Sequence, residues 1–269
     1  MQRAHSDWPY LAQIHLETVR EAGPLVHCLT NNVTTNLVAN AILAVGASPA
    51  MVDIPGEAGP FATVASGVLI NLGTGPTELW NAAREAAQSA RRAGTPFVLD
   101  PVAAGALPLR TALAHDLIEI GPAVIRGNAS EIRAIAGAGA GGKGVDSTDD
   151  AEAALDAARE LAQRTRAVVA VSGETDLITD GDAVIRVANG DPMLTRMTGA
   201  GCALGGVIAA FVGANEDTLT ATAAACAIWT IAAEEAMRTA TGPGSLQPAL
   251  LDALHSMDEG AIARLGRIS

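Results

Sequence analysis

Short apolar runs alternate with longer stretches of helix-forming residues along much of the chain. Glycine, proline or asparagine flanks most of these runs, and uninterrupted apolar character is typical of strands that are buried on both faces. The runs are too short for buried helices, which need ten or more residues. They predict strands over residues 25–29, 50–52, 68–72, 97–99, 123–125 and 168–171.

Helical patterns lie between these runs. Helix-forming residues fill one of them, 77–93, and Gly94 follows it as a stop signal. Strands that alternate with helices favour an α/β fold with a mostly parallel central sheet, helices on both faces, and ligands at the carboxyl ends of the strands. The patterns predict a leading helix within residues 1–23 and helices over 34–45, 77–93, 109–120, 130–136 and 147–163.

The last third of the chain changes character. A hairpin is predicted from 177–179 and 183–187, which turn at Asp180-Gly181-Asp182. Only helices follow, over 200–212, 218–237 and 249–265, and we expect them to close against one side of the sheet. No linker or internal repeat divides the sequence, so we expect a single domain over residues 1–269.

Composition narrows the function classes. The chain has 269 residues, 49% of them hydrophobic, and a formal net charge of −12. This charge disfavours binding to nucleic acid or to an anionic membrane surface, and no apolar tract reaches the roughly 20 residues that span a bilayer. A phosphate ligand would need backbone amides, a magnesium ion and a few placed cations. Three scattered cysteines and the lack of a signal-like apolar run predict a reducing, cytoplasmic setting.

The segment Met197-Thr198-Gly199-Ala200-Gly201-Cys202 precedes a small, apolar helical run. A glycine-rich turn at a helix start offers backbone N–H groups to an anion, at the positive end of the helix dipole. A thiol at that end is expected to have a lowered pKa and to serve as an acid or base. Two simpler explanations remain, since the glycines also suit tight packing and Cys202 also suits a small buried site.

Several polar side chains follow predicted strands. Asp100 ends one strand and can bind magnesium or take a proton, although Asp-Pro is also common in turns. Arg126 ends another, where a guanidinium needs an anionic partner. Glu131 lies on the same rim as a candidate metal ligand, but Asn128 and Glu131 also have the spacing of a capping box.

Three further positions have balanced interpretations. Ser172, before Gly173, suits close approach of a phosphate or nucleoside and equally suits a plain turn. Asn31 lies in a polar stretch that predicts either a helix cap or a pocket for a neutral substrate. Met51 is expected in the core on composition, although thioethers also pack against flat rings.

Taken together, these segments resemble the hydroxyethylthiazole kinases of the thiamine pathway, within the ribokinase-like superfamily, over nearly the whole chain. Cysteine at position 202 is typical of this family, where many ribokinase-like enzymes have aspartate. Ser172 stands where other members carry threonine, a change that keeps the hydroxyl. The matching segments are Val26–Thr34, Gly46–Met51, Leu99–Gly105, Ile125–Glu131, Lys143–Asp146, Thr198–Cys202 and Gly242–Ser245.

The resemblance implies a ribokinase-like three-layer α/β/α fold and phosphoryl transfer from ATP, with Mg²⁺, to the hydroxyl of 4-methyl-5-(2-hydroxyethyl)thiazole. It also implies a homotrimer with active sites between subunits. By similarity, Cys202 and Asp100 are catalytic, and the amides of Gly199, Ala200, Gly201 and Cys202 form an anion hole. Asn31, Met51 and Gly199 contact the alcohol, Arg126 and Ser172 contact ATP, and Glu131 and Asp100 are the magnesium candidates.

Two alternatives stay open. One is a related kinase of another small heterocyclic alcohol, such as hydroxymethylpyrimidine. The other is a non-catalytic nucleotide-binding protein, which would keep the glycine turn but would have little need of Cys202, Asp100 and Glu131 on one rim.

Overall fold

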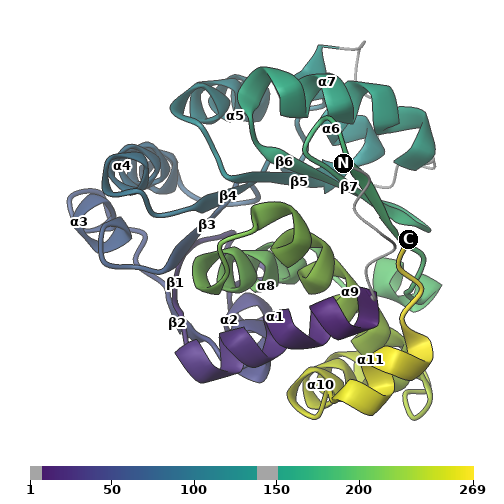
Figure 1. Ribbon diagram of the computed structural model, residues 1–269. Coiled ribbons are helices and arrows are strands. Elements are labelled where there is room, and N and C mark those ends of the chain that lie inside the picture. Colours follow the sequence, from purple (N-terminus) through teal and green to yellow (C-terminus); the bar gives the residue numbers. More distant parts are fainter. Residues whose placement is uncertain (1–7, 138–150) are drawn as a thin grey trace.

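The computed structural model describes residues 8–137 and 151–269, which form an eight-stranded sheet between two layers of helices (Figure 1). The strand order is β2-β1-β3-β4-β5-β6-β7-β8, parallel from β2 to β6 and antiparallel at β7 and β8. The expected mostly parallel sheet and hairpin are confirmed. The strands are β1 (Leu25–Leu29), β2 (Ser48–Ala50), β3 (Gly67–Asn71), β4 (Phe97–Asp100), β5 (Val124–Asn128), β6 (Val168–Ser172), β7 (Asp176–Thr179) and β8 (Val184–Val187).

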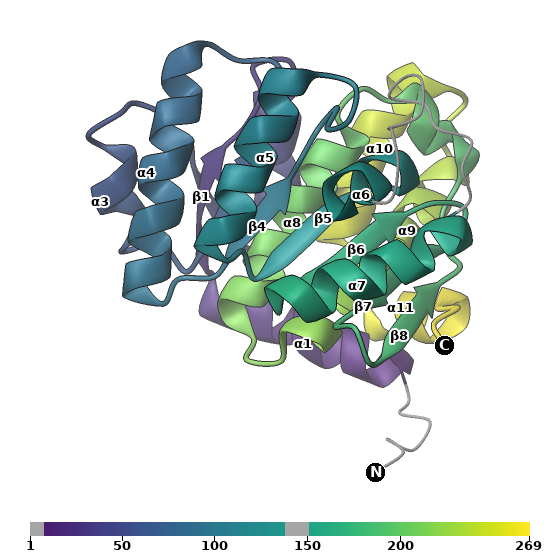
Figure 2. The ribbon, with the colours of Figure 1, turned by 90° about the horizontal axis from the view of Figure 1, so that it is seen from above.

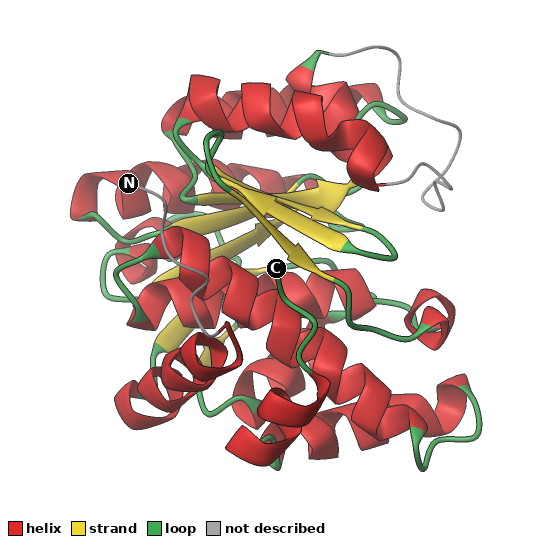
Figure 3. Ribbon diagram, turned by 45° about the vertical axis from the view of Figure 1, so that its right-hand side comes forward, coloured by secondary structure: helices red, strands yellow, loops and turns green. Residues whose placement is uncertain are grey.

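The helices divide between the two faces of the sheet, as Figures 1 and 3 show. One layer holds α3 (Ala58–Ala62), α4 (Thr77–Ala93), α5 (Pro108–Ile120), α6 (Ala129–Ala136) and α7 (Leu155–Thr165). The other holds α1 (Trp8–Ala22), α2 (Thr35–Ala44), α8 (Ala200–Ala214), α9 (Thr218–Met237), α10 (Pro243–His255) and α11 (Glu259–Leu265). Two short 3₁₀ turns, Ala151–Ala154 and Pro192–Arg196, complete the described elements.

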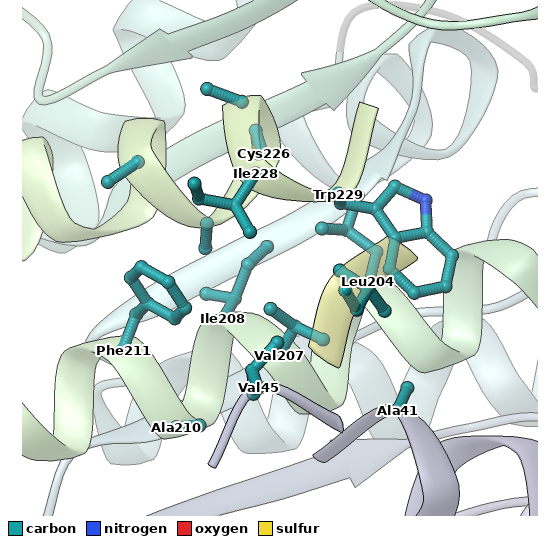
Figure 4. Close-up of a cluster of buried hydrophobic side chains, with 14 of the residues drawn as sticks. Ala41, Val45, Leu204, Val207, Ile208, Ala210, Phe211, Cys226, Ile228 and Trp229 are labelled. Atoms are coloured by element: carbon teal, nitrogen blue, oxygen red, sulfur yellow. The ribbon is translucent and has the colours of Figure 1, made fainter. Parts of the chain in front are cut away.

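Each layer has its own hydrophobic core. Above the sheet, α4 buries its alanine-rich face and ends at Gly94, whose φ of 79° is left-handed, and Figure 2 shows α4, α5 and α7 lying across the strands. Below it, α8 and α9 are apolar nearly all round, as expected for helices enclosed between the sheet and other helices. Figure 4 shows Leu204, Ile208 and Phe211 of α8 interleaved with Ile228 and Trp229 of α9.

Glycines allow α8 to lie directly against β3. A Cβ on Gly67 of β3 would collide with the carbonyl oxygen of Ala209, and a Cβ on Gly213 of α8 would lie 2.8 Å from the Ser66 carbonyl oxygen. Backbone atoms cannot move aside as a flexible side chain can, so both positions require glycine. This contact fixes the start of α8 close to the carboxyl ends of β3 and β4.

Several element boundaries differ from the sequence-based expectation. The strand predicted at 50–52 is Ser48–Ala50, because its pairing with β1 places Leu25 opposite Ser48. The single helix predicted over 249–265 is wrong: α10 ends at His255 and α11 begins at Glu259, because the Asp258 side chain caps α11 by accepting from the Ala261 N–H at 2.8 Å. Helix α3 was not predicted, and the predicted start of the helix 147–163 lies outside the described residues.

Among the described helices, none combines the length and apolar character that crossing a membrane requires.

Candidate active site

The carboxyl ends of the parallel strands meet the start of α8 at one rim of the sheet. Asp100 is the last residue of β4 and Ser172 the last of β6, while Arg126 lies within β5 and Asn31 two residues beyond β1. Cys202 is the third residue of α8. These five predicted site residues come together because parallel strands end at the same edge.

A chain of hydrogen bonds joins Cys202 to Asp100. The Asn31 side-chain Nδ2 donates to Cys202 Sγ at 3.2 Å and to Asn71 Oδ1 at 3.0 Å. Asn71 Nδ2 in turn donates to Asp100 Oδ2 at 2.7 Å. Asn71 and Asp100 are opposite each other in the register of β3 and β4, which explains the short contact. Two amides therefore connect the thiol with the carboxyl group.

Asp100 is held in an environment that disfavours its charge. The residue is 1% exposed, and burial raises the pKa of its carboxyl group to about 7, assisted by the charge of Glu131 and opposed by Arg126 and the Asn71 amide. Arg126 Nη1 lies 3.7 Å from Asp100 Oδ2, too far for a tight ion pair. Asp100 Oδ1 is buried and has no hydrogen-bond partner among the described residues.

Arg126 extends from β5 to the first turn of α8. Its Nη2 donates to Ser172 Oγ at 2.7 Å, so the two predicted ATP-binding residues contact each other. A Cβ on Gly201 would lie 2.5 Å from Arg126 Nη1. Glycine at this position therefore lets the guanidinium approach the helix start closely, beside the proposed anion site.

Glu131 makes the capping box that its spacing with Asn128 predicts. Its Oε2 accepts from the Asn128 N–H at 2.9 Å, while its Oε1 accepts from the Ala103 N–H at 2.8 Å. Ala103 has a left-handed φ of 62°, which costs energy in a residue with a Cβ, and this hydrogen bond helps to hold it. Glu131 thus shapes the loop that follows Asp100, and each of its oxygens keeps a further lone pair.

The thiol of Cys202 differs from its expected protonation behaviour. We expected the helix start to lower its pKa, but burial raises it, and the charge of Asp100 raises it further. The Thr34 side chain, the charge of Arg126 and the Asn31 donor lower the pKa of the thiol without overcoming burial. The thiol is therefore protonated at neutral pH, since even an unperturbed cysteine titrates near 8.5.

Only some of the N–H groups in the glycine turn are available to bind an anion. Gly199 caps α8 with a left-handed φ of 87°, and a Cβ there would lie 2.5 Å from Thr34 Cγ2. The Ala200 N–H donates to the Met197 carbonyl at 3.3 Å and is less available to an anion. Gly201 and Cys202 lie in the first helical turn, where N–H groups have no carbonyl acceptor four residues earlier within the helix.

Met51 follows β2 at the same end of the sheet as Asn31, half-buried against the core below the sheet. It lies outside the hydrogen-bonded chain. The preceding strand is anchored beside β1, where the imidazole of His27 makes a 2.6 Å hydrogen bond with the Val52 carbonyl.

Two buried residues of this rim were not predicted from the sequence. Asn71 interrupts an otherwise apolar strand pattern, and this interruption is the signal that could have revealed it. Asp176 accepts from the Gly173 N–H at 3.0 Å and so shapes the turn after Ser172. Burial raises the pKa of Asp176 to about 6, and Arg126 opposes the rise.

The described side chains do not by themselves form a cluster of metal ligands. In the ranges 8–137 and 151–269, no group of three or more His, Cys, Asp or Glu side chains is placed to hold an ion.

Comparisons with known proteins show which family the chain belongs to. A family model described as the hydroxyethylthiazole kinase family matches residues 16–260. Hydroxyethylthiazole kinase from Clavibacter sepedonicus is 57% identical over 251 residues, which cover 93% of this chain and 91% of that protein.

Solved structures show the same fold. The structure of hydroxyethylthiazole kinase from Pyrococcus horikoshii OT3 superposes with a TM-score of 0.89 at 35% identity, covering 97% of this chain and 98% of the other. A ribokinase-like superfamily protein from Enterococcus faecalis reaches a TM-score of 0.60 at 12% identity, covering 94% and 90% of the two chains, a likeness of fold alone. The α/β/α architecture is therefore ribokinase-like, and the chain belongs to the hydroxyethylthiazole kinase family.

Proposed function

We propose that this protein transfers the terminal phosphoryl group of ATP to the hydroxyl of 4-methyl-5-(2-hydroxyethyl)thiazole. Membership of the family supports the substrate class. The observation that carries the proposal is the rim where Cys202 is linked through Asn31 and Asn71 to Asp100, with Arg126 beside it. Phosphoryl transfer depends mainly on positioning and on charge stabilisation, and this rim supplies both.

The acceptor side is formed by Asn31, Met51 and Gly199. The polar amide of Asn31 orients the alcohol, while the thioether of Met51 packs against the flat thiazole ring. Cys202 lies beside the attacking hydroxyl, and its thiolate form accepts the proton of that hydroxyl. Because burial raises the pKa of this thiol, the thiolate is a minor form at neutral pH, and positioning by the neighbouring groups matters more than proton acceptance there.

The donor side is formed by Arg126 and Ser172, which contact the phosphates of ATP. The backbone amides at the start of α8, from Gly199 to Cys202, stabilise the charge of the migrating phosphoryl group. Arg126 already lies against this helix start, so a phosphate bound there meets a guanidinium and main-chain donors together.

A magnesium ion fits the chemistry of Asp100. Its Oδ1 is buried with no described hydrogen-bond partner, and burial raises the pKa of the carboxyl group against the opposing charge of Arg126. Asp100 and Glu131 would hold the ion, directly or through water, and phosphate oxygens would complete its shell. When bound, magnesium neutralises phosphate charge. It also favours the ionised form of Asp100.

The assay for this function is ADP formation that depends on the alcohol. With Mg²⁺ and ATP present, adding the thiazole alcohol should start turnover, and adding hydroxymethylpyrimidine should support less. Faster turnover with hydroxymethylpyrimidine would point to a related kinase. A rate of ADP formation that neither alcohol increases would refute the proposal.

We also propose that the active protein is a cytoplasmic homotrimer with sites between subunits. All three cysteines lie in described residues and are free, which is consistent with a reducing compartment. Apolar side chains are exposed along the segment between β1 and β3, which contains the edge strand β2 and Met51, and a neighbouring subunit would cover them. They are Val33, Leu43, Ile54 and Val64, each 56–68% exposed.

A further inference from the structure

Asn71 occupies the centre of the hydrogen-bonded chain although it contacts neither Cys202 nor the helix start in any described hydrogen bond. It is the last residue of β3, is 2% exposed, and bridges Asn31 and Asp100. A buried amide whose polar atoms all have specific partners has one stable orientation. The orientation of Asn71 therefore constrains both neighbours.

Backbone donors determine which end of each amide is oxygen. The Gly73 N–H donates to Asn71 Oδ1 at 2.9 Å, and the Val33 N–H donates to Asn31 Oδ1 at 3.1 Å. Because a backbone N–H cannot accept, turning either amide over would oppose two donors. Asn31 Nδ2 must therefore face Asn71 and Cys202, and Asn71 Nδ2 must face Asp100.

Close packing leaves Asn31 little freedom. A Cβ placed on Gly73 would lie 2.6 Å from Asn31 Nδ2, so this loop presses directly on the amide. Asn31 Nδ2 has two hydrogens, one for Asn71 Oδ1 and one for Cys202 Sγ. Without the Asn71 acceptor, one buried hydrogen of Asn31 Nδ2 loses its partner, and the hydrogen bond to Cys202 Sγ loses the second contact that fixes its direction.

We propose that Asn71 is a positioning residue for phosphoryl transfer, which aims the Asn31 amide at Cys202 and ties it to Asp100. The inference rests on the proposed function for its catalytic consequence. Its structural content, a donor held against Cys202 Sγ by a residue that does not touch the sulfur, is testable without substrates.

The test compares three variants. Asn71→Leu keeps the size of the side chain and removes its polar atoms, and Asn71→Ser keeps a hydroxyl too short to bridge both neighbours. Asn189→Leu is the matched control, because Asn189 is also buried and also makes side-chain hydrogen bonds, in its case to Leu265 and Arg267 near the C-terminus.

The first readout is alkylation of Cys202 by iodoacetamide in the ligand-free full-length protein, followed by mass spectrometry as a function of pH. Cys28 and Cys226 are each 1% exposed, whereas Cys202 is half-buried, so the native protein reacts at Cys202. Loss of the aimed donor disfavours the thiolate and should slow alkylation about three- to tenfold at pH 8, moving the pH profile upward. A merely loosened structure would expose the sulfur and speed alkylation.

The second readout is kcat for ADP formation, which should fall about tenfold or more in both Asn71 variants and stay near the parent value in Asn189→Leu. Alkylation in the Asn71 variants that is as fast as in the parent, or faster, would overturn the proposal. If Asn71→Leu does not fold, Asn71→Ser decides by the same criterion. If the parent shows no alcohol-dependent turnover, the proposed function fails, while the alkylation rates still decide whether Asn71 aims the donor.

Discussion

At the scale of single residues, the site combines a thiol and a carboxyl group that burial keeps protonated to a higher pH than usual. Burial raises the pKa of both Cys202 and Asp100, the latter to about 7. The amides of Asn31 and Asn71 act against these shifts at their two ends of the chain. Proton position in this site is therefore set by burial together with a few aimed hydrogen bonds.

Replacing Cys202 separates proton acceptance from positioning. Cys202→Ala should lower kcat about 10²-fold without abolishing it, because the amides and Arg126 remain. Cys202→Asp should retain or raise kcat, since a carboxylate is a competent base at that place. Steady-state kinetics measure both. Complete loss in Cys202→Ala with substrate binding intact would contradict the role of a simple base.

The pH dependence of kcat provides a second measure of the thiol. A raised thiol pKa leaves Cys202 protonated at neutral pH, so kcat should keep increasing with pH above about 8.5, where an unperturbed thiol would already be half ionised. Cys202→Asp should lose that increase. An identical pH profile in the two proteins would show that the thiol does not supply the titrating group.

Asp100 is predicted to cost stability at neutral pH. In the unfolded chain an aspartate titrates near 3.9, whereas the folded value is about 7. The folded state holds the proton longer, so the contribution of this group to the unfolding free energy falls as pH rises from about 4 to 7.

Asp100→Asn removes that cost. The Tm of the variant should therefore be higher than that of the parent at pH 8, by about 2–4 °C for each kcal/mol gained in the free energy of unfolding. The difference in Tm should narrow towards pH 4. Its kcat should fall at least about 10²-fold. Calorimetry at several pH values measures the first effect; a variant less stable than the parent at pH 8 would contradict it.

At the scale of elements, the start of α8 and the end of β5 are fitted to each other. Gly201 lets the Arg126 guanidinium approach the helix, and Gly67 lets α8 approach β3. These glycines let the start of α8 lie close to the carboxyl ends of the parallel strands. The position of the proposed anion site therefore depends on packing along the whole length of α8.

Gly201→Ala should displace Arg126 and raise the KM for ATP about tenfold, since the new Cβ would lie 2.5 Å from Arg126 Nη1. Gly244→Ala is the control: Gly244 is likewise the second residue of its helix, α10, and a Cβ there meets nothing within 4 Å. Steady-state kinetics with varied ATP should give the same KM for the control as for the parent. Equal KM values in both variants would remove Arg126 from the ATP site.

Most elements were predictable because buried parallel strands form short apolar runs and α4 has a clear polar face. The break between α10 and α11 was missed because the helical pattern continues across the Asp258 cap. Asn71 was missed because its side-chain partners, Asn31 and Asp100, lie 40 and 29 positions away in the sequence. The pKa of Cys202 was predicted in the wrong direction because burial arises only from tertiary packing.

At the scale of the whole molecule, the exposed apolar side chains belong to the segment between β1 and β3, which also contains Met51 of the proposed alcohol site. Leu43→Glu together with Ile54→Glu should disrupt a trimer, because buried unpaired carboxylates are costly at an interface. Light scattering should give about three times 27.1 kDa for the parent and less for the variant.

Leu109→Glu is the control, because Leu109 is 71% exposed at the start of α5, in the helix layer on the opposite face of the sheet from α2. This variant should keep the mass of the parent. A parent that is monomeric at working concentrations would contradict the proposed assembly.

The most direct test of the proposed function is identification of the product by mass spectrometry and phosphorus NMR. Incubation with ATP, Mg²⁺ and 4-methyl-5-(2-hydroxyethyl)thiazole should yield one phosphomonoester of the alcohol for each ADP formed. ADP without that phosphomonoester, or a phosphate ester formed faster on hydroxymethylpyrimidine, would contradict it.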